Sequence, residues 1–124
     1  MTIWGTGANW SGEDKSSEFI NDGYVKIGWS KENSPVLYNV LREVKVGDGI
    51  YIKAFIPRNK TLRIKAFGEV KQTDGNILKV EWIKTFDNSL EYHLTESEEK
   101  YNVYPFTFYK EYSDEIKNII KNAL

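Results

Sequence analysis

The stretch VKVGDGIYIKAFIPRNKTLRIKAFGEV, residues 44 to 70, contains the strongest structural signals in the chain. A Gly-Asp-Gly turn at 47–49 leads into an apolar run, which predicts a strand over residues 50–56. The polar segment 57–60 predicts an exposed, basic loop after it. A second strand is expected from residue 61, with three apolar side chains alternating onto one face: Leu62, Ile64 and Ala66.

A hairpin extends this pair of strands on its C-terminal side. Gly68 interrupts the second strand, which is typical of a β-bulge or a barrel corner. The sequence TDGN at 73–76 predicts an Asp-Gly turn, and the alternating residues of 77–83 predict the partner strand. The remaining segments are expected to be a polar loop over 86–101, a last strand over 103–109 and a C-terminal helix capped by Ser113.

The N-terminal third also shows short strands and a helix. TIWGTGANW, residues 2–10, begins as a strand and ends in Gly and Asn, which favour a loop. The next segment predicts a short helix that ends near Gly23, with Ser11 or Ser16 as its N-cap. YVKIGW, residues 24–29, then alternates as a strand packed on one side does.

Ser34 and Pro35 predict the start of a second helix, because proline at the first helical position gives up no hydrogen bond. Six short strands, with helices between the early ones and at the end, indicate an α+β fold. We expect a single domain over residues 1–124, built on a small, strongly curved and partly open β-barrel of five to six strands with flanking short helices.

The composition agrees with one folded domain. The chain has 124 residues, of which 40% are hydrophobic and 28% charged, and it contains no cysteine. Aromatic residues make up 15%, which is more than a core of this size usually requires. The sequence has neither a signal-like N-terminus nor a membrane-spanning run, so we expect a soluble, cytoplasmic protein.

Charge is unevenly distributed along the chain. The net charge is −1, but residues 26–84 carry twelve basic against six acidic groups. The segments on either side, 1–25 and 85–124, are both net acidic. This distribution favours an anionic partner for one face, although solvated strands with alternating lysines would give the same count.

The sequence offers little for catalysis. His93 is the only histidine and lies in a polar stretch, where an ordinary surface imidazole is expected. There is no cysteine nucleophile, no nucleotide-binding glycine motif and no group with metal-ligand spacing. The sequence therefore predicts a protein that is not an enzyme and uses neither a metal nor a cofactor.

The tryptophans offer more for binding. Trp4 and Trp82 lie on predicted strands and are expected in the core. Trp10 closes the loop after the first strand and Trp29 ends the strand predicted over 24–29, and planar rings in such places can sandwich a flat ligand. In the alternative interpretation, Trp10 and Trp29 only close the ends of the barrel.

The order of these motifs resembles the EVE domains, which are relatives of the YTH and PUA domains. The resemblance covers about residues 2–83 and is carried by GYVKIGW at 23–29, VKVGD at 44–48 and AFGEV at 66–70. It departs from the family at the first strand, where IWGTGAN replaces an aromatic strand that runs into Lys-Ser-Glu.

This resemblance implies a PUA-like barrel that recognises a nucleobase, often a modified one, flipped from DNA or RNA. Our first hypothesis for the base is a methylated or hydroxymethylated cytosine in DNA. The implied partner is nucleic acid with a modified base, with any effector protein encoded separately. The base-binding residues it implies are Asn9, Trp10, Trp29 and Ser30. Basic residues expected to hold the nucleic-acid backbone are Arg58, Lys60, Arg63 and Lys65.

Two alternatives remain at this stage. A PUA-like module could bind structured RNA through its basic surface, with the pocket secondary. The aromatic residues could instead form an interface with another protein or a second copy of the chain, without any nucleic acid.

Overall fold

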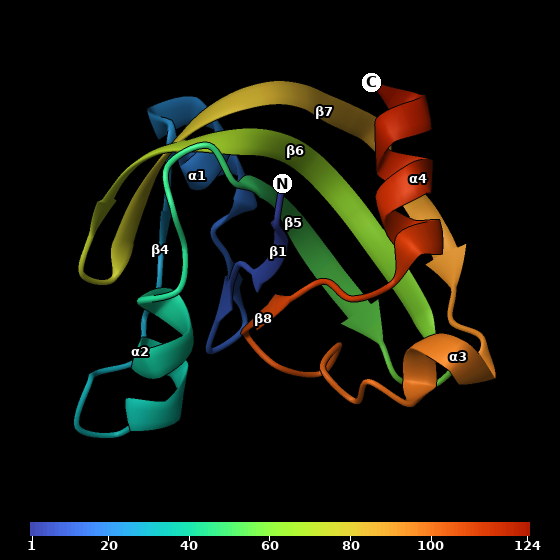
Figure 1. Ribbon diagram of the computed structural model, residues 1–124, viewed down its shortest axis with the longest axis horizontal. Coiled ribbons are helices and arrows are strands. Elements are labelled where there is room, and N and C mark those ends of the chain that lie inside the picture. The colour runs from blue at the N-terminus through green and yellow to red at the C-terminus, as the bar shows by residue number, and fades with distance from the viewer.

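The computed structural model describes residues 1–124 and shows a six-stranded sheet curled into a half-barrel, with four short helices around it (Figure 1). The predicted α+β fold with a partly open barrel is thus confirmed. In sheet order the strands are β4 (Tyr24–Lys26), β7 (Ile77–His93), β6 (Thr61–Asp74), β5 (Gly49–Ile56), β1 (Ile3–Gly7) and β8 (Phe108–Lys110). A separate two-stranded ribbon consists of β2 (Asn9–Trp10) and β3 (Glu13–Asp14). The helices are α1 (Ser16–Asp22), α2 (Pro35–Leu41), α3 (Glu96–Glu99) and α4 (Asp114–Ala123).

The long strands β5, β6 and β7 form an antiparallel meander, in which the predicted Asp-Gly hairpin at 73–76 joins β6 to β7. Gly68 allows β6 and β7 to approach closely, since a Cβ built there would lie 2.6 Å from the carbonyl oxygen of Glu81. The register shifts between Phe67 and Gly68, which confirms the predicted bulge. β1 then pairs parallel with β5 and antiparallel with β8, so that β8 forms one edge of the sheet.

A second bulge corrects the predicted alternation in β6. Against β5, the adjacent residues Ile52 and Lys53 pair with Ala66 and Ile64, so β6 carries one extra residue there, which reverses the faces that follow. Leu62 and Ile64 therefore belong to one core cluster, whereas Ala66 belongs to the other. The expectation that all three share one face was wrong.

Two hydrophobic clusters hold the sheet. The larger cluster contains Trp4 of β1 and Phe19 of α1. The smaller cluster packs Ile116 and Ile120 of α4 against the sheet. Trp4 is fully buried, as predicted. Trp82 is partly buried against the larger cluster, and its Nε1 donates a hydrogen bond to the carbonyl of Phe19 at 2.8 Å.

A buried carboxylate joins the residues after β8 to the smaller cluster. Glu111 is 1% exposed and accepts hydrogen bonds from the hydroxyls of Tyr51 and Tyr104, each at 2.6 Å. Burial raises the pKa of the Glu111 carboxyl, although these hydrogen bonds act in the opposite direction. Since every oxygen of this network has a partner, we interpret it as structural.

Only some of the helix caps are the residues that the sequence predicts. Gly23 ends α1 with a φ of 72°, and Pro35 begins α2 after Ser34, as predicted. Ser113 caps α4 by accepting a hydrogen bond from the amide of Ile116. Neither Ser11 nor Ser16 is the N-cap of α1; Lys15 holds that position, and Asp14 accepts the bond from the Ser16 amide.

Three boundaries differ from the prediction. β4 ends at Lys26, so Trp29 lies outside the strand. The expected loop over 86–101 is wrong, because β7 continues to His93 and α3 follows it. The last strand, β8, is three residues long, and only two of them, Phe108 and Tyr109, fall within the strand expected over 103–109. No helix is both long and apolar enough to cross a membrane.

Candidate functional site

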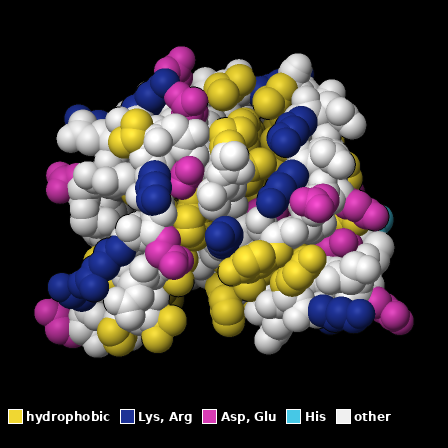
Figure 2. Space-filling view, in the orientation of Figure 1, with side chains coloured by type: hydrophobic (Ala, Val, Ile, Leu, Met, Phe, Trp, Pro, Cys, Tyr) yellow, Lys and Arg dark blue, Asp and Glu magenta, His cyan; other side chains and the backbone are white.

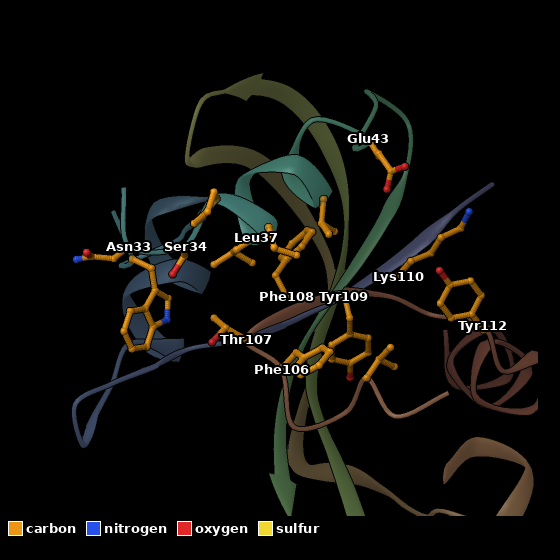
Figure 3. Close-up of a pocket in the computed structure, with 15 residues that line it drawn as sticks. Asn33, Ser34, Leu37, Glu43, Phe106, Thr107, Phe108, Tyr109, Lys110 and Tyr112 are labelled. Carbon is orange, nitrogen blue, oxygen red and sulfur yellow. The ribbon is translucent and has the colours of Figure 1, made fainter. Parts of the chain in front are cut away.

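A cavity of about 530 Å³ lies between α2 and β8. Figure 3 shows Leu37 of α2 facing Thr107 and Phe106, with Asn33 and Ser34 at one end and Lys110 and Tyr112 at the other. The apolar part of its lining includes Trp29, Val36, Leu37, Val40, Phe106 and Phe108. Hydrophobic side chains border the notch between α2 and the loop before β8 (Figure 2).

Trp29 lies at this cavity with its indole 56% exposed. The turn that carries it is fixed by hydrogen bonds: the hydroxyl of Tyr38 donates to the Trp29 carbonyl at 2.8 Å, and the Ser34 amide donates to the Ser30 carbonyl at 3.0 Å. The Ser30 hydroxyl accepts from the Asn33 amide at 3.2 Å. These hydrogen bonds fix the backbone of the turn, while the Trp29 ring remains exposed to solvent. The Ser30 hydroxyl is used within this turn, by accepting the Asn33 amide.

Phe106 provides a second exposed ring in the same cavity. Its side chain is 57% exposed, and its amide donates to the carbonyl of Val103 at 2.9 Å. The next residue, Thr107, accepts from the Gly7 amide at 2.7 Å, which fixes the loop against β1. The sequence pattern does not single out Phe106, because this residue lies within the strand predicted over 103–109 and is 77 residues from Trp29.

Trp10 lies elsewhere. Its ring packs edge-on against Phe19 of the larger core cluster, with ring centroids 6.3 Å apart. It also covers Gly28, where a Cβ would lie 3.0 Å from the indole. The structure therefore does not bring Trp10 and Trp29 into one cavity, and Trp10 has the packing expected of a residue that closes the barrel end.

Asn9 lines a second, more polar cavity of about 370 Å³, together with Lys53, Lys65 and Asp14. The Asn9 side chain accepts a hydrogen bond from the Gly12 amide at 2.8 Å. Burial alone would raise the pKa of Asp14, but hydrogen bonds from Ser16 and Lys65 outweigh it and lower the pKa to about 2. The Asp14 carboxylate is therefore charged at neutral pH.

The basic residues selected from the sequence lie on the β5–β6 hairpin, and three of the four are paired with acids. Their ion pairs are Lys60 with Glu99 at 3.5 Å, Arg63 with Glu91 at 3.0 Å and Lys65 with Asp14 at 3.0 Å. Arg58 has no acidic partner. Basic and acidic side chains are interspersed on the face shown in Figure 2. Exposed pairs of this kind contribute little stability, so they can exchange for another anion.

His93 ends β7 and places its Nδ1 2.9 Å from the hydroxyl of Thr61. No group of three or more His, Asp or Glu side chains is arranged to hold a metal ion. What the described residues offer is a binding surface with two exposed rings and polar groups at its margins.

Comparison with models of protein families gives no match for this chain, and comparison with curated proteins gives none either.

Proposed function

We propose that the protein is a nucleic-acid-binding reader that accommodates a flipped, modified nucleobase in the cavity between α2 and β8. The observation that carries the proposal is the solvent-exposed indole of Trp29 at a cavity of about 530 Å³. Small-molecule sites typically have volumes of roughly 300 to 1,000 Å³, so the space is sufficient for a base. We place this activity in the cytoplasm, since a chain without cysteine suits a reducing compartment.

The energetics of base flipping favour this kind of site. Extruding a base costs a few kcal/mol, and stacking on an aromatic side chain returns roughly 1 to 3 kcal/mol per base. Trp29 supplies one such ring and Phe106 a second. Asn33, Ser34 and Thr107 add polar groups that can distinguish the edges of one base from another.

The nucleic-acid backbone would continue toward the β5–β6 hairpin. Thr107 lines both cavities, and Pro57 of the hairpin borders the second one. Arg58, next to Pro57, is free of acidic partners and is the hairpin residue best suited to a phosphate. The affinity of such contacts falls as salt concentration rises.

Titration with matched oligonucleotides tests this proposal. DNA and RNA of one sequence would carry cytosine, 5-methylcytosine or 5-hydroxymethylcytosine at one position, and binding would be followed by fluorescence anisotropy. We expect Trp29→Ala to weaken binding of the preferred modified strand roughly tenfold or more, because a stacking partner is lost. Trp29→Phe keeps a ring and should retain most of the affinity.

Ile83→Ala is the matched control, because Ile83 is also exposed but lies on β7 and does not line the cavity. It should bind as the parent protein does. If Trp29→Ala binds modified and unmodified strands as tightly as the parent, the assignment of the cavity is wrong. A preference for RNA over DNA at equal salt would identify the structured-RNA alternative.

A protein-interaction domain is a second candidate, and the free edge of β8 favours it. Thr107 and Glu111 make hydrogen bonds to β1 through their backbones, and Tyr109 lies opposite Gly5. By alternation, the amides and carbonyls of Phe108 and Lys110 point away from β1. An added strand could pair with them between β8 and α2.

If the partner of the interaction domain is a second copy of this chain, light scattering distinguishes this candidate from the nucleic-acid reader. Lys110→Pro removes an outward-facing amide and leaves the bonds to β1 in place. A mass that rises with concentration in the parent but not in Lys110→Pro, together with no oligonucleotide binding at low salt, would support the interaction domain. A constant monomeric mass with oligonucleotide binding would support the reader.

A further inference from the structure

A buried lysine without an acidic partner lies in the second cavity. Lys53, on β5, is only 8% exposed and lines the polar cavity of about 370 Å³ at the end of β1. Its ammonium donates one hydrogen bond, to the carbonyl of Tyr104 at 2.7 Å. None of the ion pairs in the structure includes it.

This arrangement leaves the ammonium only partly satisfied. A lysine ammonium has three donors, and the protein accepts one of them. The ring of Tyr109, 5.5 Å away, offers its face but no carboxylate. Burial of an unpaired charge is costly, and such groups are usually paired or bound to a ligand. Accordingly, burial lowers the pKa of Lys53 to about 8, so the group is still mainly protonated at neutral pH.

The other charges at the cavity already balance each other. Asp14 accepts hydrogen bonds from Lys65 at 3.0 Å and from the Ser16 hydroxyl at 2.6 Å. With two lysines and one aspartate in its lining, the cavity carries one net positive charge, and this charge belongs to Lys53. Asn9 uses its carbonyl oxygen toward Gly12, which leaves its amide group as a further donor.

We propose that Lys53 marks a binding site for a small anionic group, a phosphate or a carboxylate, in this polar cavity. The anion would accept the free donors of the Lys53 ammonium and supply the negative charge that the protein does not provide. Two sources carry this chemistry: a free anion, or a phosphodiester of a nucleic-acid strand. The site does not depend on base binding at Trp29, which lines the other cavity.

The test measures the pKa of Lys53 itself. Protein labelled with ¹³C-lysine would be titrated with alkali, and the Lys53 resonance assigned by its loss in Lys53→Met. The titration would be repeated with inorganic phosphate, with acetate and with an unmodified single-stranded oligonucleotide, each at matched ionic strength. A bound anion stabilises the charged ammonium, so we expect the Lys53 pKa to rise by at least one unit, a tenfold change in its protonation equilibrium.

The three probes distinguish the sources. A rise with phosphate or acetate identifies a site for free anions, and a rise with the oligonucleotide alone identifies a phosphodiester site. No rise with any probe would mean that water alone completes the hydrogen bonds of Lys53, and would overturn the proposal. If Lys53→Met does not fold, Lys53→Arg, which keeps a positive charge and hydrogen-bond donors at this position, assigns the resonance instead, while the pKa itself is measured in the parent protein.

Two variants provide controls. Lys79→Met removes an exposed lysine on β7 and should leave the anion effect on Lys53 unchanged. In Trp29→Ala the effects of phosphate and acetate on Lys53 should also be unchanged, since Trp29 lines the other cavity, so the anion site and the base-binding proposal can fail separately. Anion-induced shifts of the Gly7 and Asn9 amides should accompany the pKa change in the parent and disappear in Lys53→Met. Shifts of equal size in Lys53→Met would count against the site.

Discussion

At the scale of single residues, Trp29 and Lys53 are each out of their usual environment. Trp29 is 56% exposed, so most of its apolar surface is not buried. Lys53 is only 8% exposed and has no acidic partner, which costs free energy of folding. The sequence singles out Trp29, because a large aromatic residue ends the predicted strand and a hydroxyl residue follows it at once. It does not single out Lys53, since a lysine is ordinarily exposed to solvent and only the fold places the Tyr104 carbonyl beside this one.

The buried position of Lys53 predicts a specific dependence of stability on pH. Its folded pKa of about 8 lies below its ordinary value of 10.5, so the unfolded chain binds the proton more tightly between these values. The free energy of unfolding should therefore rise with pH across this window, by about 3 kcal/mol relative to Lys53→Met. Urea denaturation of both proteins from pH 7 to 10.5 measures it. Parallel stability curves would show that Lys53 is not desolvated.

At the scale of elements, the sequence predicted the turns and strands whose structure depends on residues close together in the chain. The turn at 47–49, the strand after it and the Asp-Gly hairpin appear where the sequence places them. The C-terminal half of β7 was missed because its strand is polar and irregular, with Ser89 at a φ of 55°. By contrast, the capping box formed by Thr95 and Glu98 at the start of α3 is a local signal that the sequence does contain.

The bulged contact between β6 and β7 predicts a marked effect of Gly68→Ala. A Cβ at this position would lie 2.6 Å from both the Glu81 carbonyl oxygen and the Val80 side chain, so the two strands must move apart. We expect a loss of roughly 1 to 3 kcal/mol in the free energy of unfolding, which urea denaturation measures. Gly7→Ala is the control, because its nearest neighbour is 3.7 Å away. Equal losses in both variants would refute the close approach.

At the scale of the whole molecule, the candidate site depends on contacts that no local pattern contains. The cavity forms because α2 lies beside β8, the edge strand that the chain reaches only after the entire β5–β7 meander (Figure 1). Trp29 and Phe106 both line this cavity, and Asn9 and Lys53 both line the other one. Of the two aromatic walls that the sequence suggested, Trp10 and Trp29, only Trp29 lines this cavity, and the residues that accompany it there could be identified only from the fold.

The ¹⁹F spectrum of protein labelled with 5-fluorotryptophan tests the base-binding cavity most directly. The four tryptophans give four resonances, and Trp29→Phe identifies that of Trp29. Saturation with an oligonucleotide carrying 5-methylcytosine or 5-hydroxymethylcytosine should shift the Trp29 resonance, and the unmodified strand should shift it less. The resonance of Trp4, buried in the core, should stay in place. A Trp29 resonance that does not move with any of these strands would contradict the proposal.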